Sequence, residues 1–282
     1  MNRTLYLDKS NNALRVSQFN QIDADVRFAG IGVKYVVSGE EVYFANQRRF
    51  TVREGEYIIG NDFTTSSVRI DHPIPVQGIC VDISPEIITE VAEYHALSAN
   101  ELSEFLLSDQ FLVNTYKAKN TSLGYSLREL NTQLGHRARQ EEVLRVELFY
   151  SLAESIITDQ RFVLNHLSKL NFKKAITNEE VLRSLLSARE VMDDSLAADL
   201  SLDEISAHAG LSKYHFIRLF KSTFGMSPYQ YIRRRGLEAA RIDLQKGHSL
   251  TDVAVRFGFA DSSAFSKAFR KEFGSSPGSV RK

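Results

Sequence analysis

Two segments near the C-terminus each carry a row of basic, hydroxyl and apolar side chains at helical spacing. The first row consists of Lys213, Tyr214, Ile217, Arg218 and Lys221. The second row consists of Ser262, Ser263, Lys267 and Arg270. Arginine and lysine donate hydrogen bonds to guanine edges, serine bonds to several bases, and apolar groups pack on the thymine methyl. On an outward helix face, each row predicts a surface that reads base edges in a DNA groove.

The position of each side chain along its helix predicts what it meets. Lys221 and Arg270 lie furthest along, so we expect them to meet phosphate, which positions a protein without reading sequence. For every basic residue in the two rows the alternative is a solvated surface charge. Tyr214 could instead pack against its own domain, since its ring is large and apolar.

Both rows belong to a repeat of the sequence. Gly210 aligns with Gly258 at an offset of 48 residues. Later positions align at an offset of 49, which pairs Phe216, Phe220, Phe224, Gly225 and Pro228 with Phe265, Phe269, Phe273, Gly274 and Pro277. The same apolar spacing and the same turn residues in both copies indicate that one structural unit occurs twice.

Each copy predicts two helices joined by a tight turn. Leu202, Ile205 and Ala209 form an apolar stripe at helical period, and Gly210 then suits a left-handed exit from the first helix. Ser212 in the first copy, and Asp261 in the second, can cap the following helix. This is a helix-turn-helix, the motif that places its second helix in a DNA major groove.

Residues 227–247 predict one helix between the two copies, with Ser227 as N-cap, Pro228 in the first turn and Gly247 after the end. A helix of about 17 residues is ~25 Å long. Such a spacer would separate the second helices by something near one turn of B-DNA, ~34 Å. Residues 233–235 are three arginines that could assist at the DNA backbone or form a solvated face.

Charge is distributed unevenly along the 282 residues. Residues 201–282 contain 14 basic residues (Lys and Arg) and 7 acidic residues (Asp and Glu), a net charge of +7. Residues 1–200 contain 21 basic and 28 acidic residues, a net charge of −7. This asymmetry indicates that the C-terminal part meets a polyanion. We expect no membrane span, no secretory signal and a cytoplasmic location, and the single cysteine, Cys80, fits a reducing compartment.

The rest of the chain predicts an α+β protein in three parts. Residues 1–84 are β-rich, with short strand-like runs from Val26 to Ile83 that suggest a barrel or sandwich. Residues 85–175 are helical, and residues 176–282 hold both helix-turn-helix units. The apolar stripe in residues 144–157 could be core or a dimer interface, and we favour the interface slightly.

Catalytic chemistry has little support in the sequence, and we expect no catalytic residue, metal or cofactor. His72 and His95 stand 23 residues apart with no second histidine near either, unlike a metal-binding cluster. Residues 274–278 match the G-x-S-x-G pattern, but that motif requires a strand before it and a helix after it.

The final hundred residues resemble the DNA-binding domain of the AraC/XylS family of bacterial transcription regulators. The matching stretches are LSLDEISAHAGLSKYHFIRLFKSTFGMSPYQYIRRRGLEAARIDL and SLTDVAVRFGFADSSAFSKAFRKEFGSSPGSVRK. The resemblance implies that base contacts come from Tyr214, Ile217 and Arg218, and from Ser262, Ser263 and Lys267. Two departures are Val280, where an aromatic is commoner, and Gly236, which would interrupt the linker helix. More weakly, YVVSGEEVYFANQRRFTVREGEYIIGN resembles the cupin-like effector-binding barrel of the family.

The leading hypothesis is therefore a sequence-specific transcription regulator that binds double-stranded DNA and reads two successive major grooves. A small-molecule effector bound by the N-terminal domain would modulate it, with a homodimer expected and RNA polymerase a further partner. One alternative is an effector-independent dimeric regulator, and another is a small-molecule-binding or catalytic cupin with secondary DNA binding. Activation and repression use the same DNA contacts, so both stay open.

Overall fold

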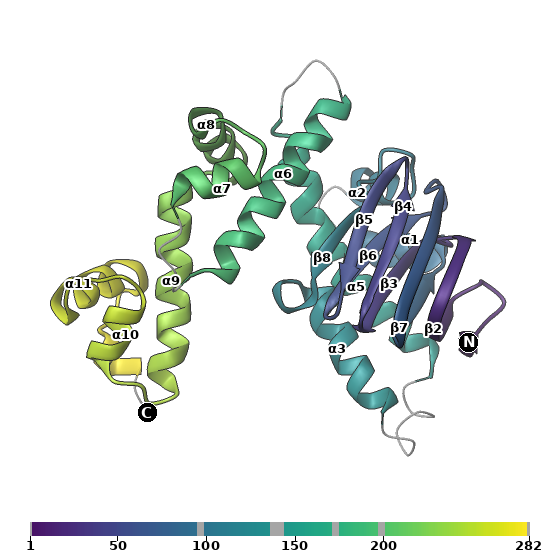
Figure 1. The fold of residues 1–282 in the computed structure, drawn as a ribbon, viewed down its shortest axis with the longest axis horizontal. Helices are drawn as coiled ribbons and strands as arrows, with labels where there is room; N and C mark the ends of the chain where they lie inside the picture. The colour runs from purple at the N-terminus through teal and green to yellow at the C-terminus, as the bar shows by residue number, and fades with distance from the viewer. Residues whose placement is uncertain (1, 95–98, 136–143, 171–174, 197–200, 281–282) are drawn as a thin grey trace. The chain divides into compact units, whose positions relative to one another are not determined.

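The computed structural model describes residues 2–94, 99–135, 144–170, 175–196 and 201–280. The chain divides into two compact units, Met1–Asn165 and His166–Lys282, which are described separately below. The first unit contains the strands and the second is helical, so the predicted α+β class is confirmed (Figure 1). His95, used above to argue against a metal cluster, and His136 lie outside the described residues.

Antiparallel strands form the sheet of the first unit. Their bounds are β1 Asn2–Leu7, β2 Ala13–Val26, β3 Ile31–Ser38, β4 Glu40–Ala45, β5 Arg48–Arg53, β6 Glu56–Asn61, β7 Ser66–Ile83 and β8 Asn114–Lys117. The hydrogen-bonded order is β1-β2-β7-β3-β6-β8, and the β4-β5 hairpin joins through β4 to β7. These described strands form one antiparallel sheet, in which β8 comes from residues 85–175, predicted to be helical, and the cupin-like barrel stays a prediction.

The strand boundaries correct the sequence prediction at two places. Strand structure begins at Asn2, not Val26. The prediction missed β1 and much of β2 because many of their residues are polar and exposed, which leaves only a weak apolar pattern. The predicted runs SVRI and QGICVDI form one strand, β7, that continues through Pro73 and Pro75. The register between β7 and β2 shifts near these two prolines, so the N–H groups that proline lacks are not needed for hydrogen bonds between the two strands.

Helices cover the sheet of the first unit, as Figure 1 shows for α3 and α5 behind the strands. The helical bounds are α1 Pro85–Tyr94, α2 Ala99–Leu106, η1 Ala118–Asn120, α3 Ser122–Leu134 and α5 Val146–Leu167. Within the predicted stripe, Phe149, Leu152 and Ile156 are at most 1% exposed. The ring of Phe149 lies 4.9 Å from that of Tyr6 on β1. The apolar stripe in residues 144–157 is therefore part of the core of the first unit, and is not the dimer interface that the sequence analysis slightly favoured.

The second unit consists of helices. Their bounds are α6 Ala175–Asp194, α7 Leu202–His208, α8 Lys213–Phe224, α9 Pro228–Gln245, α10 Leu250–Arg256, α11 Ser262–Phe273 and η3 Pro277–Val280. One apolar cluster joins α6, α7 and α8, and a second joins α9, α10 and α11. The linker helix α9 contributes Tyr231 to the first cluster and Leu237 to the second.

Gly236 does not interrupt α9, contrary to the expectation from the sequence, because the helix runs unbroken from Pro228 to Gln245. Gly236 is buried, and a methyl group at this position would lie 3.7 Å from Cδ1 of Phe257. That is an ordinary van der Waals distance, so the approach of α9 to the end of α10 leaves room for an alanine at this position.

Candidate DNA-binding surface

The second helix of each helix-turn-helix begins at the cap that the sequence predicted. Ser212 Oγ accepts a hydrogen bond from the His215 amide at 3.4 Å, and Asp261 Oδ1 accepts one from the Ala264 amide at 2.6 Å. Each cap satisfies one amide that the first helical turn leaves without a backbone acceptor. These bonds fix where α8 and α11 start, and therefore which side chains share each face.

Left-handed glycines make both turns. Gly210 has φ +66° and Gly258 has φ +74°, a conformation that costs other residues about 1–2 kcal/mol. Both first helices therefore end in the same left-handed conformation, although Ser212 follows Gly210 by two residues and Asp261 follows Gly258 by three. The repeat seen in the sequence is therefore a repeat of local geometry.

The apolar face of each second helix is buried as predicted. Phe216 and Phe220 on α8, and Phe265 and Phe269 on α11, are 0% exposed. Residues on the opposite face reach solvent, and Tyr214 is 76% exposed, so its ring does not pack on its own domain. The two rows of predicted reading residues are thus brought to outward helix faces.

The exposed cations differ in what they already contact. Arg218, Lys221, Lys267 and Arg270 are exposed and form no ion pair with any other described residue. Lys213 instead donates to Asp203 Oδ2 at 2.8 Å. An exposed pair of this kind is worth only about 0–1 kcal/mol, so a phosphate could displace Asp203.

Two residues of the predicted rows are less accessible than the others. Ile217 is half-buried against the first apolar cluster, and Ser262, the first residue of α11, is half-buried too. Ser263 is exposed beside it. Among the residues that the resemblance implies for base contacts, Tyr214, Arg218, Ser263 and Lys267 are therefore the exposed ones.

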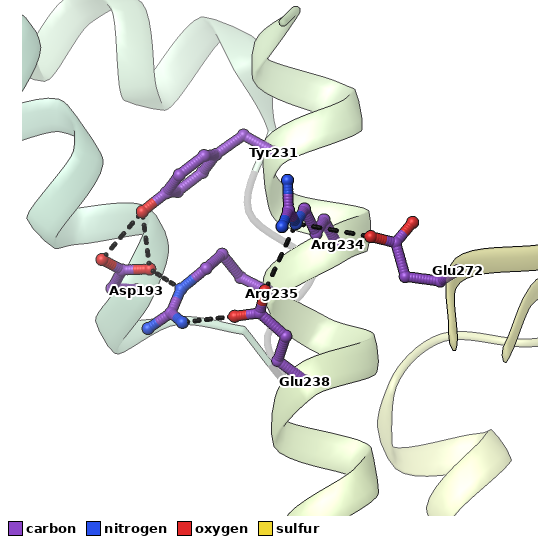
Figure 2. A network of polar contacts seen from close by, with 6 residues as sticks. All are labelled: Asp193, Tyr231, Arg234, Arg235, Glu238 and Glu272. Carbon is purple, nitrogen blue, oxygen red and sulfur yellow. Dashed lines mark hydrogen bonds and ion pairs between the residues drawn. The ribbon is translucent and has the colours of Figure 1, made fainter. Parts of the chain in front are cut away.

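The arginines of the linker helix hold the domain together. Figure 2 shows Arg235 Nε donating to Asp193 Oδ1 at 2.8 Å, while its Nη1 lies 2.5 Å from Glu238 Oε2. Arg234 Nε lies 3.3 Å from Glu238 Oε1 and 3.3 Å from Glu272 Oε1 of α11. These two arginines thus contact carboxylates of their own chain, and a role for them at the DNA backbone stays a prediction.

Tyr231 completes this network. Its hydroxyl lies 3.0 Å from Asp193 Oδ2 and 3.1 Å from Oδ1. Burial, and next the negative charge of Asp193, raise the pKa of the Tyr231 hydroxyl, which stays a hydrogen-bond donor. No spacing in the sequence could have found this contact, because 38 residues separate the two partners.

Three further features of the described part of the chain concern metal binding, nucleophilic catalysis and membrane crossing. No three His, Cys, Asp or Glu side chains there lie close enough together to hold a metal ion. The helix α11 precedes residues 274–278, which is not the strand that a nucleophile elbow requires. Among the described helices, none has the length and apolar character needed to cross a bilayer.

Residues 205–282 match the family described as a helix-turn-helix domain. The transcriptional activator RhaS of Klebsiella pneumoniae is 31% identical over 147 residues, which are 52% of this chain and 47% of RhaS. The probable transcription factor PqrA of Proteus vulgaris is 36% identical over 29% of this chain and 68% of PqrA. A solved regulator from Chromobacterium violaceum, described as AraC-type, is 30% identical over 35% of this chain and 88% of its own, with a TM-score of 0.34.

Two capped helix-turn-helix units joined by one linker helix define a DNA-binding domain of the helix-turn-helix class. The chain belongs to the AraC/XylS family of transcription regulators. The match to RhaS spans about half of that relative's length.

Proposed function

We propose that the chain is a sequence-specific transcription regulator that places α8 and α11 in successive major grooves of double-stranded DNA. The observation that carries the proposal is the pair of rows on two capped helices, in which four exposed cations form no ion pair with any other described residue. Unpaired, exposed cations on a helix at a groove can bond to bases and phosphates without first breaking a contact.

Within each row we assign a role by accessibility and chemistry. Arg218 and Lys267 are the donors to guanine, Ser263 donates to or accepts from a base edge, and Tyr214 supplies an apolar and hydroxyl contact. Ile217 and Ser262 lie nearer the protein and contact bases by packing or short hydrogen bonds. Phosphate contacts come from a further set, Lys213, Lys221 and Arg270.

The first unit is proposed to bind a small-molecule effector and to support a homodimer, and occupancy of this unit would change how the DNA-binding domain is presented. RNA polymerase is a further proposed partner, because a bound regulator must communicate with the transcription machinery. No cofactor, metal or catalytic residue enters this mechanism.

The test is a selection of bound sequences from a random duplex library with the full chain at ~150 mM salt, where binding by charge alone is weak. We expect an enriched site with two short elements about one helical turn, ~34 Å, apart. An Arg218→Ala, Lys267→Ala double variant serves as control and should lose the enrichment. Binding that is sensitive to salt but selects no sequence, with wild type and variant alike, contradicts the proposal.

A further inference from the structure

A pocket of about 410 Å³ lies in the first unit, lined from β1, β2, β3, β4 and β7. Successive residues of a strand point to opposite faces, so Arg15, Lys34 and Asp82 share the pocket face while Leu14 and Val81 are buried on the other. The volume falls in the range of pockets for single small molecules, roughly 300–1,000 Å³.

The strand register gathers charge at one end of this pocket. Arg15 on β2 and Lys34 on β3 both pair with Cys80 on β7, so their side chains flank it. Lys34 Nζ lies 3.3 Å from Asp82 Oδ1, and Arg15 Nη1 bonds to Asp82 Oδ2. Two cations therefore share Asp82, and neither of them forms an ion pair with Glu41, the second carboxylate that lines the pocket.

The ammonium of Lys34 is short of hydrogen-bond acceptors. Its side chain is 8% exposed, and Asp82 is its one acceptor among the described residues. An ammonium has three N–H donors, and a buried charge without hydrogen bonds is costly. The Nζ atom also lies 5.4 Å from the ring centroid of Phe28, which offers only a weak contact. An anion in the pocket would satisfy the remaining donors.

A buried acceptor lines the same pocket. Glu41 is 5% exposed, and its Oε2 accepts a hydrogen bond from the Tyr43 hydroxyl at 2.6 Å. Its other oxygen, Oε1, accepts no hydrogen bond within the described part of the chain. This free oxygen would accept a bond from a hydroxyl or amine of a ligand.

Apolar side chains form the remaining walls. They come from β2 and β7 and include Phe19, Ile22, Val68 and Ile70. A ligand for this pocket therefore combines an anionic group, a hydrogen-bond donor and an apolar body of modest size. A wholly polar or cationic molecule would leave either the walls or the Lys34 donors without a partner.

We propose that this pocket binds a small organic carboxylate that also carries a hydroxyl or amine, with the carboxylate at Lys34 and Arg15 and the donor at Glu41. The assignment rests on the effector-binding role proposed above and names the chemistry of the ligand. Bonds between a carboxylate and cations in a buried site are among the strong hydrogen bonds of proteins.

The test is calorimetric titration of the full chain, without DNA, with 3-(4-hydroxyphenyl)propionate and with its neutral amide. We expect the acid to bind and the amide to bind at least about tenfold more weakly, because the amide lacks the charge-assisted bonds. Lys34→Met should lower the affinity for the acid by at least about tenfold, since methionine has a similar volume and lacks the N–H donors. The matched control Lys9→Met, at an exposed lysine, should bind as wild type does.

If Lys34→Met unfolds at a markedly lower temperature than wild type, Arg15→Gln provides a second variant, at a side chain that is 29% exposed. Equal binding of acid and amide, no binding of the acid, or unchanged binding by a folded Lys34 or Arg15 variant overturns the assignment. The selection of DNA sites is read separately. Sites selected without acid binding would contradict only the pocket, and acid binding without selected sites would contradict only the DNA-reading function.

Discussion

Arg235 Nε of the linker helix lies 2.8 Å from Oδ1 of Asp193, the penultimate residue of α6 (Figure 2). The Asp193 side chain is 9% exposed and also accepts from Tyr231, so one nearly buried carboxylate receives two residues of α9. A helix that precedes the first helix-turn-helix is thereby fixed to the helix that follows it. The second helix of the first helix-turn-helix, α8, lies between these two anchored segments in the chain.

Replacing Asp193 by alanine should destabilise the second unit. The change leaves Tyr231 and Arg235 without their shared acceptor, and we expect a loss of about 1–3 kcal/mol in the free energy of unfolding. Urea denaturation of the full chain, followed by circular dichroism, measures this loss. Asp203→Ala is the control, because its pair with Lys213 is exposed and should contribute about 0–1 kcal/mol. Equal losses in the two variants would show that the network adds no more than a surface pair.

Removing the guanidinium of Arg218 should relax the choice of base at one position of the selected site. We expect Arg218→Ala to cost about 1–3 kcal/mol on the selected sequence and less on an unrelated one. Competition binding with duplexes that vary one base pair at a time locates the affected position. Lys246→Ala is the control, at an exposed lysine that caps α9. Unchanged affinity and preference in Arg218→Ala would exclude the assignment of α8 to a groove.

Lys221 should behave differently, because a phosphate contact carries no sequence information. Lys221→Ala is expected to weaken binding to selected and unrelated duplexes by a similar factor. The slope of log affinity against log salt should become shallower by about one, since one fewer counterion is released. Affinities measured across a salt series test this directly. A loss confined to the selected duplex would instead place Lys221 at a base.

Burial of Glu41 predicts a change of stability with pH. Burial raises the pKa of this carboxyl above its usual 4.5, so the folded chain holds the proton more tightly than the unfolded chain does. The resulting stabilisation is full below pH 4.5 and is lost as pH rises through the folded-state pKa. The glutamine of Glu41→Gln stays neutral at every pH. The Tm of this variant should therefore rise relative to the Tm of wild type as pH rises from 4.5 to 7.

Thermal melts of both proteins across this range measure the difference. Glu93→Gln controls for the loss of one negative charge at an exposed position of α1. If the Tm difference for Glu41→Gln stays constant with pH, the Glu41 carboxyl is not protonated preferentially in the fold.

The sequence predicted the second unit in detail because its determinants are local. Caps such as Ser212 and Asp261 act within three residues, and Gly210 needs only its own backbone conformation. The apolar stripe that contains Phe216 and Phe220 repeats at helical period, which also fixes the outward face. Prediction was weaker for the first unit, where polar strands such as β1 carry little apolar signal and where the two prolines of β7 looked like breaks.

Local patterns of residues therefore predict the family, the paired helix-turn-helix units and the rows of side chains on their outward faces, since each depends on neighbours in the chain. Only the tertiary structure decided which charges already have partners. Arg235 and Asp193 are 42 residues apart, and Arg15 and Asp82 are 67 apart. Lys34 stands in an ordinary apolar run, and strand pairing alone brings it to a shared carboxylate inside a pocket. Such contacts arise from the packing of distant segments, which no local spacing encodes.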